Sequence, residues 1–352
     1  MNLEQMSYRC PGLHGPGTRQ DISRQTLAQV LEKYPKLIIP LFQRRYCWTE
    51  IQFEKWWNDV HHGERDYFGQ HCTGKVRVKP NENQELIIID GQQRFTTTII
   101  LLATLRNRMK NHKEANKYLM NGDDYRLIPS YLDRPAFYSI IKNDSVNNHD
   151  IASYQWKAYH YFNRKNETLN DNDIEEMFIN ALHKMSVMLV VIVNEVNMGQ
   201  IYLWLQEKSL FGMGSLLINL SPGENLTGGD MVRNLVMAAV ADEALETQEQ
   251  FYFQYWLKPI EEKLNGSVTD FLFTFVQKFD FDHEAKSETY IRLYLKDKPK
   301  EEKNLLAYGR FYSLYEWKLK IASESKDLLD VDQECVIRVT KELLCEMAKE
   351  LL

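Results

Sequence analysis

A short polar motif follows an apolar segment in the N-terminal third of the chain. Residues 86–89 read LIII, and residues 90–94 read DGQQR. An apolar run of this length is typical of a buried central strand, and the apolar spacing after the motif predicts a helix over 92–110. The motif therefore lies in a tight turn at a helix N-terminus, where unpaired backbone N–H groups and the helix dipole favour a phosphate group.

The side chains of the motif suit phosphate chemistry. Gly91 lets the backbone approach a ligand, Gln92 and Gln93 offer amide donors, and Arg94 offers a two-pronged donor for phosphate oxygens. Asp90 is suited to hold Mg²⁺ or a water at the phosphates. The alternative is an ordinary capped helix, with Asp90 as the N-cap and Gln93 as its capping-box partner.

A second stretch, residues 39–48, reads IPLFQRRYCW. Arginines flanked by aromatic side chains can bind a phosphate and stack against a base. Taken alone, the stretch equally fits a surface loop that Tyr46 and Trp48 pin to the core.

Together the two stretches resemble the N-terminal domain of GmrSD-type, modification-dependent restriction proteins, which belongs to the ParB/sulfiredoxin-like superfamily. A third stretch agrees with this order, because Gly223, Leu226, Thr227, Asp230 and Asn234 match the later loop-and-helix motif of that family. The resemblance spans roughly residues 30–280.

The resemblance implies an NTP-binding domain that hydrolyses its nucleotide with Mg²⁺ and is coupled to nucleic-acid defence. By position, the expected catalytic residues are Asp90, Gln93 and Arg94, with Asp90 also the metal ligand. The expected nucleotide-binding residues are Gln43, Arg44, Gly91, Gln92, Thr97, Asp230 and Asn234. The expected partners are a nucleoside triphosphate and either a nucleic acid or an effector protein. For Asp230 and Asn234 the competing interpretation is an N-cap aspartate and an exposed asparagine.

The chain departs from the family pattern in two ways. Leu220 stands where the family usually has an asparagine, so a nucleotide-gated sensor without turnover is the main alternative to an NTPase. Family members that cut DNA often carry an HNH domain, which needs histidine, and the last histidine of this chain is His283. We therefore do not expect the chain to be a nuclease by itself. A P-loop-like spacing, Gly69 to Lys75, lacks the following Ser or Thr and reads as a strand.

The elements that must position these motifs can be read from the spacing of apolar residues. Strands are expected over 36–40, 75–79, 86–89 and 187–193. Besides the helix over 92–110, with its apolar stripe of Phe95, Ile99, Leu102, Leu105 and Met109, helices are expected over 50–61, 153–164, 171–185, 230–242, 246–264, 267–279, 301–321 and 332–351. The pattern predicts an α+β fold, a small mixed α/β domain followed by a larger helical body.

Expected domains are a flexible arm (1–29), the ParB/sulfiredoxin-like nucleotide-binding domain (30–113), a helical extension with one strand (114–245) and a helical C-terminal domain (246–352). Five scattered cysteines indicate reduced thiols in a cytoplasmic or nuclear compartment, and no apolar run is long enough to span a membrane. The net charge of −6 argues against general nucleic-acid binding. A nucleic-acid-binding module nevertheless stays open, through Lys75, Arg77, Lys79, Arg106, Arg108 and Lys110.

Overall fold

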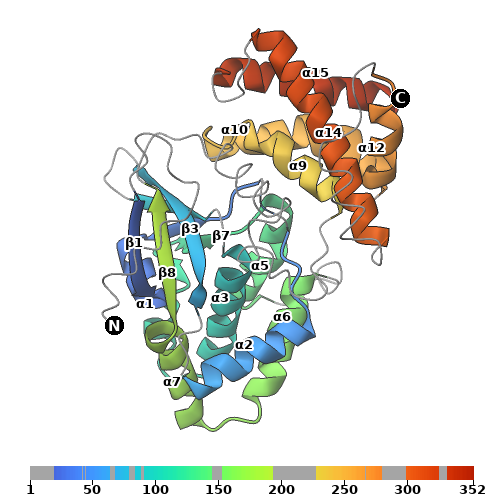
Figure 1. Cartoon of the computed structure of the whole chain (residues 1–352). Helices are drawn as coiled ribbons and strands as arrows, with labels where there is room; N and C mark the ends of the chain where they lie inside the picture. Colours follow the sequence, from blue (N-terminus) through green and yellow to red (C-terminus); the bar gives the residue numbers. More distant parts are fainter. Residues whose placement is uncertain are drawn as a thin grey trace, which may run out of the picture. The chain divides into compact units, whose positions relative to one another are not determined.

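The chain divides into two compact units. Unit 1 comprises Met1–Ile39, Tyr46–Pro129 and Asp133–Val196, and unit 2 comprises Pro40–Arg45, Ser130–Leu132 and Asn197–Leu352. The structure is a computed structural model (Figure 1). It describes residues 20–41, 43, 45–63, 68–78, 84–88, 91–144, 153–192, 227–265, 267–279, 299–324 and 331–352.

Unit 1 is built on a mixed six-stranded sheet with the order β1-β8-β3-β4-β2-β7. Strands β1 and β8 pair antiparallel, as do β3 and β4, whereas β2 runs parallel to both β4 and β7, and β3 runs parallel to β8. The strands are β1 (Gln20–Thr26), β2 (Lys36–Ile38), β3 (Phe68–Val78), β4 (Gln84–Ile88), β7 (Leu127–Ile128) and β8 (Ser186–Ile192).

Strand β4 is a central strand, as its apolar run predicts. Leu86 and Ile88 have no exposed surface and Ile87 is also buried, because β4 lies between β3 and β2. The P-loop-like spacing falls within β3, so that segment is a strand and no helix follows Lys75 directly. The side chains of Lys75 and Arg77, and residue Lys79, lie outside the described part of the chain.

The sheet also takes strands from outside the range 30–113. Strand β8, far along the chain, pairs with both β1 and β3. Strand β1 and the start of α1 (Leu27–Lys33) are formed by residues expected in the flexible arm. Residues 20–29 are therefore part of the fold.

Helix α3 (Gln92–Arg106) is the central helix of unit 1, and it packs against α4, α5, α6 and α7 (Figure 1). The expected stripe from Phe95 to Leu105 is buried, but so is every other residue of α3 except Arg94. The expected end near Lys110 is wrong, because α3 ends at Arg106 and Met109 lies in the following turn. A helix covered on all sides has no amphipathic stripe from which its end can be read.

The remaining helices of unit 1 surround α3 and the sheet. Thr49 and Gln52 form the expected capping box at the start of α2, with the Thr49 N–H donating to Gln52 Oε1 at 2.9 Å. Helix α7 continues into a π-helical turn over Asn180–Lys184. The other elements are α2 (Glu50–His62), α4 (His112–Asn116), α5 (Arg134–Lys142), α6 (Tyr154–Asn166), α7 (Asp171–Ile179) and a hairpin of β5 (Met120–Asn121) and β6 (Asp124–Tyr125).

Unit 2 is helical in its described part, which confirms the expected helical body. Helix α9 packs against α12 and α14, and α15 packs against α14. A π-helical stretch, Tyr252–Glu261, joins α10 to α11. The helices are α9 (Gly228–Ala238), α10 (Leu245–Phe251), α11 (Glu262–Leu264), α12 (Val268–Val276), α14 (Pro299–Ser323) and α15 (Gln333–Lys349). Across the residues described, no helix is both long and apolar enough to cross a membrane.

The position of β4 leads to a stability prediction. Ile88→Asp should abolish soluble expression, since an unpaired buried carboxylate costs more than the whole stability margin of a domain. Ile51→Asp is the matched control, because Ile51 is 69% exposed on α2 and should tolerate the charge. Soluble yield and far-ultraviolet circular dichroism of both variants provide the measurement. A folded Ile88→Asp protein would show that β4 is not a buried strand.

Candidate functional site

The turn before α3 has the backbone geometry expected for an anion site. Gly91 is the N-cap, with φ of 102°, a left-handed conformation that favours glycine. The first hydrogen bond within the helix runs from the Phe95 N–H to the Gly91 carbonyl at 3.1 Å. The N–H groups of Gln92, Gln93 and Arg94 therefore take no part in the helical ladder.

The capped-helix alternative is wrong in detail. The N-cap is Gly91 rather than Asp90, and Gln93 uses its side-chain oxygen elsewhere. Asp90 and Arg44 themselves lie outside the described residues. The turn is thus placed by Gly91 and by the burial of the helix that follows it.

The aromatic end of the IPLFQRRYCW stretch is tied to the first two turns of α3. The Cys47 N–H donates to Gln93 Oε1 at 3.0 Å. The Tyr46 hydroxyl and the Thr97 hydroxyl lie 2.6 Å apart, and the Thr97 hydroxyl also donates to the Gln93 carbonyl at 2.7 Å. Thr97 has no exposed surface, and its hydroxyl contacts Tyr46 and the backbone.

Arg94 is the place where α3 reaches the surface. Its neighbours Gln92, Gln93 and Phe95 are buried, whereas Arg94 is partly exposed. A guanidinium at the first turn of a helix adds a charged, two-pronged donor to the N–H groups there. This end of α3 therefore concentrates donors for an anion.

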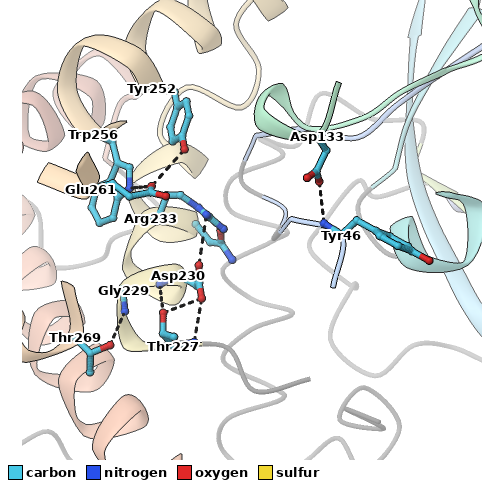
Figure 2. Close-up of polar contacts among 11 residues, drawn as sticks. Tyr46, Asp133, Thr227, Gly229, Asp230, Arg233, Tyr252, Trp256, Glu261 and Thr269 are labelled. Atoms are coloured by element: carbon cyan, nitrogen blue, oxygen red, sulfur yellow. Dashed lines mark hydrogen bonds and ion pairs between the residues drawn. The ribbon is translucent and has the colours of Figure 1, made fainter. Parts of the chain in front are cut away.

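Asp133 is a buried carboxylate that sequence reasoning missed. Its Oδ2 accepts the Tyr46 N–H at 2.8 Å (Figure 2). The consecutive N–H groups of Tyr46 and Cys47 therefore bind to Asp133 and to α3, respectively. The chain passes between the two units at Arg45–Tyr46 and at Leu132–Asp133. Tyr46 and Asp133 both belong to unit 1, and each is the first residue of one of its segments, so their hydrogen bond joins the starts of two segments of that unit.

The third motif begins α9 in unit 2, and its N–H groups already have partners. The Asp230 N–H donates to Thr227 Oγ1 at 3.0 Å, and Asp230 Oδ2 accepts the Thr227 N–H at 3.1 Å. The Gly228 N–H donates to Asn304 Oδ1 at 3.1 Å, and the Gly229 N–H donates to Thr269 Oγ1 at 3.2 Å (Figure 2). Side chains therefore occupy the first turn of α9.

Thr227, and not Asp230, is the N-cap of α9. Asp230 is its capping-box partner, so the N-cap interpretation of Asp230 is wrong by three residues. The interpretation of Asn234 as exposed is also wrong, because only 1% of its surface is accessible.

Asp230 and Asn234 hold a buried arginine, Arg233, which sequence reasoning also missed. Arg233 Nη1 lies 3.4 Å from Asp230 Oδ1, and Nη2 donates to Asn234 Oδ1 at 3.1 Å (Figure 2). A buried guanidinium is costly unless it is paired and hydrogen-bonded, which explains why the acid and the amide flank it at these positions. The spacing Asp230-x-x-Arg233-Asn234 is the sequence signal that could have revealed this cluster.

An aromatic group lies beside this arginine. Burial raises the pKa of the Tyr252 phenol, the Glu261 carboxylate adds to the rise, and Arg233 and Arg45 oppose it. Tyr252 donates to Glu261 Oε2 at 3.3 Å, and Trp256 Nε1 donates to the same oxygen at 2.8 Å (Figure 2).

Gln43 and Arg233 both border one small cavity within unit 2. Its volume is about 10 Å³, which is room for a single water rather than for a nucleotide. The other residues around it are Leu41, Arg45, Ser130, Tyr131, Leu132 and Tyr252.

The expected site residues thus fall into two groups. Gly91, Gln92, Gln93, Arg94 and Thr97 share the start of α3 in unit 1. In unit 2, Gln43 shares the small cavity with Arg233, and Arg233 is held by Asp230 and Asn234. Among the residues described, no group of three or more His, Cys, Asp or Glu side chains is placed to hold a metal ion.

The two glycines of α9 give a packing prediction. A Cβ at Gly229 would lie 2.7 Å from the Val268 Cβ, so Gly229→Ala should destabilise unit 2 by about 1–3 kcal/mol through overpacking. Adding Val268→Ala keeps the Cβ but removes the Val268 Cγ1, which would lie 2.9 Å from the new Cβ, so it should restore part of that stability. Contacting residues couple by about 0.5–3 kcal/mol. Urea unfolding of the two single variants and the double variant measures the coupling. Strictly additive effects would contradict the packing role of Gly229.

Comparison with known proteins places the chain in a family. The model of the family described as GmrSD restriction endonuclease, N-terminal domain, matches residues 27–237, which is more than half of the 352 residues. Comparison with curated proteins found no match. The matched range runs from the start of α1 almost to the end of α9, so it contains the start of α3 and the Arg233 cluster. The chain therefore belongs to the GmrSD restriction endonuclease N-terminal domain family.

Proposed function

We propose that the chain binds a nucleoside triphosphate at the first turn of α3 and hydrolyses it with Mg²⁺. The observation that carries the proposal is the start of α3. A left-handed Gly91 precedes N–H groups outside the helical ladder, and Arg94 is the one residue of a buried helix that reaches the surface. Phosphate oxygens fit such a set of donors.

The other residues of the turn would position this site. Gln93 holds the Cys47 N–H through its side-chain oxygen, so we assign it to positioning the loop as well as to the chemistry. Thr97 supports the same loop through Tyr46. Arg94 would stabilise the charge that develops on the transferred phosphoryl group.

The contribution of unit 2 would be indirect. Side chains already bind the N–H groups of Gly228, Gly229 and Asp230, so we do not propose the start of α9 as the phosphate site. Asp230 and Asn234 would act by fixing Arg233. We therefore propose Arg233 as the functional cation of the third motif, with Asp230 and Asn234 as its positioning residues.

Two carboxylates fit a magnesium ion at the phosphates. Mg²⁺ is usually held by one or two carboxylates together with substrate phosphates. Asp90 directly precedes Gly91 in the sequence, and the buried Asp133 binds the same loop through the Tyr46 N–H. When bound, the ion would neutralise charge on the triphosphate and help to orient the attacking water.

A second candidate function is nucleotide binding without turnover. Leu220 favours it, because the family usually has an asparagine at that position. In this version the nucleotide would act as a signal to an effector protein or a nucleic acid. The description of the family as a restriction endonuclease supports a role in restriction for either version.

The first prediction concerns binding. Arg94→Ala should weaken triphosphate binding by about 1.5–3 kcal/mol, as the loss of a hydrogen bond to a charged group does. The control is Arg338→Ala, which removes an equal charge from an exposed side chain of α15. Isothermal titration calorimetry with each of ATP, GTP, CTP and UTP gives the affinities. Equal affinity in Arg94→Ala and the wild type would remove Arg94 from the site.

A second prediction separates the two versions of the proposal. If the chain is an NTPase, Asp90→Asn should keep nucleotide binding and should greatly reduce phosphate release. Asp123→Asn, in the exposed turn between β5 and β6, is the control and should retain wild-type turnover.

Phosphate release and calorimetry on the same samples decide between the outcomes. Saturable binding without release in the wild type would favour the sensor. Equal turnover in the wild type and in Asp90→Asn would contradict the role of Asp90. Absence of binding in both would contradict the nucleotide site.

A further inference from the structure

The far end of α3 borders an open cavity of about 630 Å³ in unit 1. Five cationic side chains line it, and no aspartate or glutamate is among its described lining residues. The cations are Arg106, Lys113, Lys117, Arg126 and Lys142. We call this cavity the distal pocket. Because α3 has 15 residues and rises about 1.5 Å per residue, it lies roughly 20 Å along the helix from Gly91.

Arg106 brings a buried charge to the distal pocket, and its hydrogen-bond acceptors in the described part of the chain are neutral. It is 7% exposed, and its guanidinium donates to Asn116 Oδ1 at 3.0 Å, to Asn107 Oδ1 at 3.0 Å and to the Ile141 carbonyl at 2.7 Å. Burial consequently lowers the pKa of Arg106, as expected for a cation that no opposite charge compensates.

Arg126, a second lining residue of the distal pocket, is also held by neutral acceptors. It donates to the backbone carbonyls of Lys117 at 3.0 Å, Leu31 at 3.2 Å and Pro35 at 3.3 Å. Burial lowers its pKa too, and no carboxylate among the described residues offsets this effect. Two guanidiniums are thus held rigidly by neutral groups, which leaves their charge available to an anion.

The helix C-termini at the pocket offset only part of this positive charge. Helices α3 and α5 both end at the pocket, and each C-terminus carries a partial negative charge of about one half. Glu114 pairs with Lys117 and compensates one further cation. When the two helix C-termini and Glu114 are subtracted from the five lining cations, an excess of roughly three positive charges remains.

A second cavity, of about 450 Å³, borders the turn that follows α3. Its lining includes Glu167 as well as Arg108, Arg164 and Asn166, and Arg164 also pairs with Glu50 at 3.6 Å. Asn166 is 1% exposed, and neither its side-chain oxygen nor its nitrogen has a hydrogen-bond partner among the residues described. Because Asn166 is almost fully buried and Glu167 lines the same cavity, we do not include this cavity in the anion site proposed below.

We infer that the distal pocket is a second anion site, for a ligand that carries several phosphate groups. Free polyphosphate and the phosphodiesters of a nucleic-acid backbone share the chemistry that it recognises. Lys113 and Lys142 would contribute exposed charge, and the two arginines would contribute fixed donors. The inference is independent of the nucleotide site proposed at Gly91.

The test removes two exposed charges for which the described residues supply no carboxylate partner. The pocket variant is Lys113→Gln with Lys142→Gln, and the control is Lys157→Gln with Lys184→Gln, which removes the same charge elsewhere in unit 1. All proteins carry Arg94→Ala, so that the proposed nucleotide site is already weakened. The probes are inorganic tripolyphosphate, followed by calorimetry, and a short DNA duplex, followed by fluorescence anisotropy over a series of salt concentrations.

The pocket variant should bind at least one of these probes about tenfold or more weakly, and the control should stay within about twofold of its parent. For the duplex, the slope of log affinity against log salt should fall by about two, one for each lysine that no longer neutralises a phosphate. Weaker binding confined to tripolyphosphate identifies a free polyphosphate, and weaker duplex binding identifies a nucleic-acid backbone. No binding of either probe by the Arg94→Ala parent, or equally weakened binding in pocket variant and control, would overturn the inference.

Discussion

The burial of α3 along its whole length is the constraint on which the proposed site depends. A helix that is buried along its length and packed against α4, α5, α6 and α7 can reach a ligand only at its ends. At the first end, Gly91 turns the backbone and Arg94 reaches the surface; at the other, Arg106 enters the distal pocket. Both proposed anion sites of unit 1 therefore lie at the ends of one rigid element.

The three sequence motifs have different physical tasks. The DGQQR turn would supply donors, whereas the Tyr46–Cys47 segment is bound to α3 and to Asp133 within unit 1. In the third motif, side chains of the α9 N-cap, α12 and α14 bind the N–H groups at the start of α9. Asp230 of the same motif holds Arg233. Close packing favours glycine at the start of α9, because a Cβ at Gly228 would lie 2.9 Å from the Asn304 carbonyl oxygen and one at Gly229 would lie 2.7 Å from the Val268 Cβ.

Local patterns in the sequence predict much of this arrangement. The strand before Gly91, the helix after it, the capping box at Thr49 and nearly all the later helices follow from apolar spacing and capping residues. Contacts between residues that are distant in the sequence cannot be predicted from such local patterns. The pairing of β8 with β1 and β3, the Asp133 acceptor and the Asn304 cap on Gly228 join residues 76 to more than 150 positions apart, and no local periodicity records them.

The central claim is that backbone N–H groups at the start of α3, and not those at the start of α9, receive the phosphates. Hydrogen–deuterium exchange with and without a nucleoside triphosphate and Mg²⁺ tests it directly. We expect the nucleotide to slow exchange at Gln92, Gln93 and Arg94 and to leave Gly228, Gly229 and Asp230 unchanged, because side chains already bind these three. Slowing at the start of α9 with no change at the start of α3 would contradict the claim.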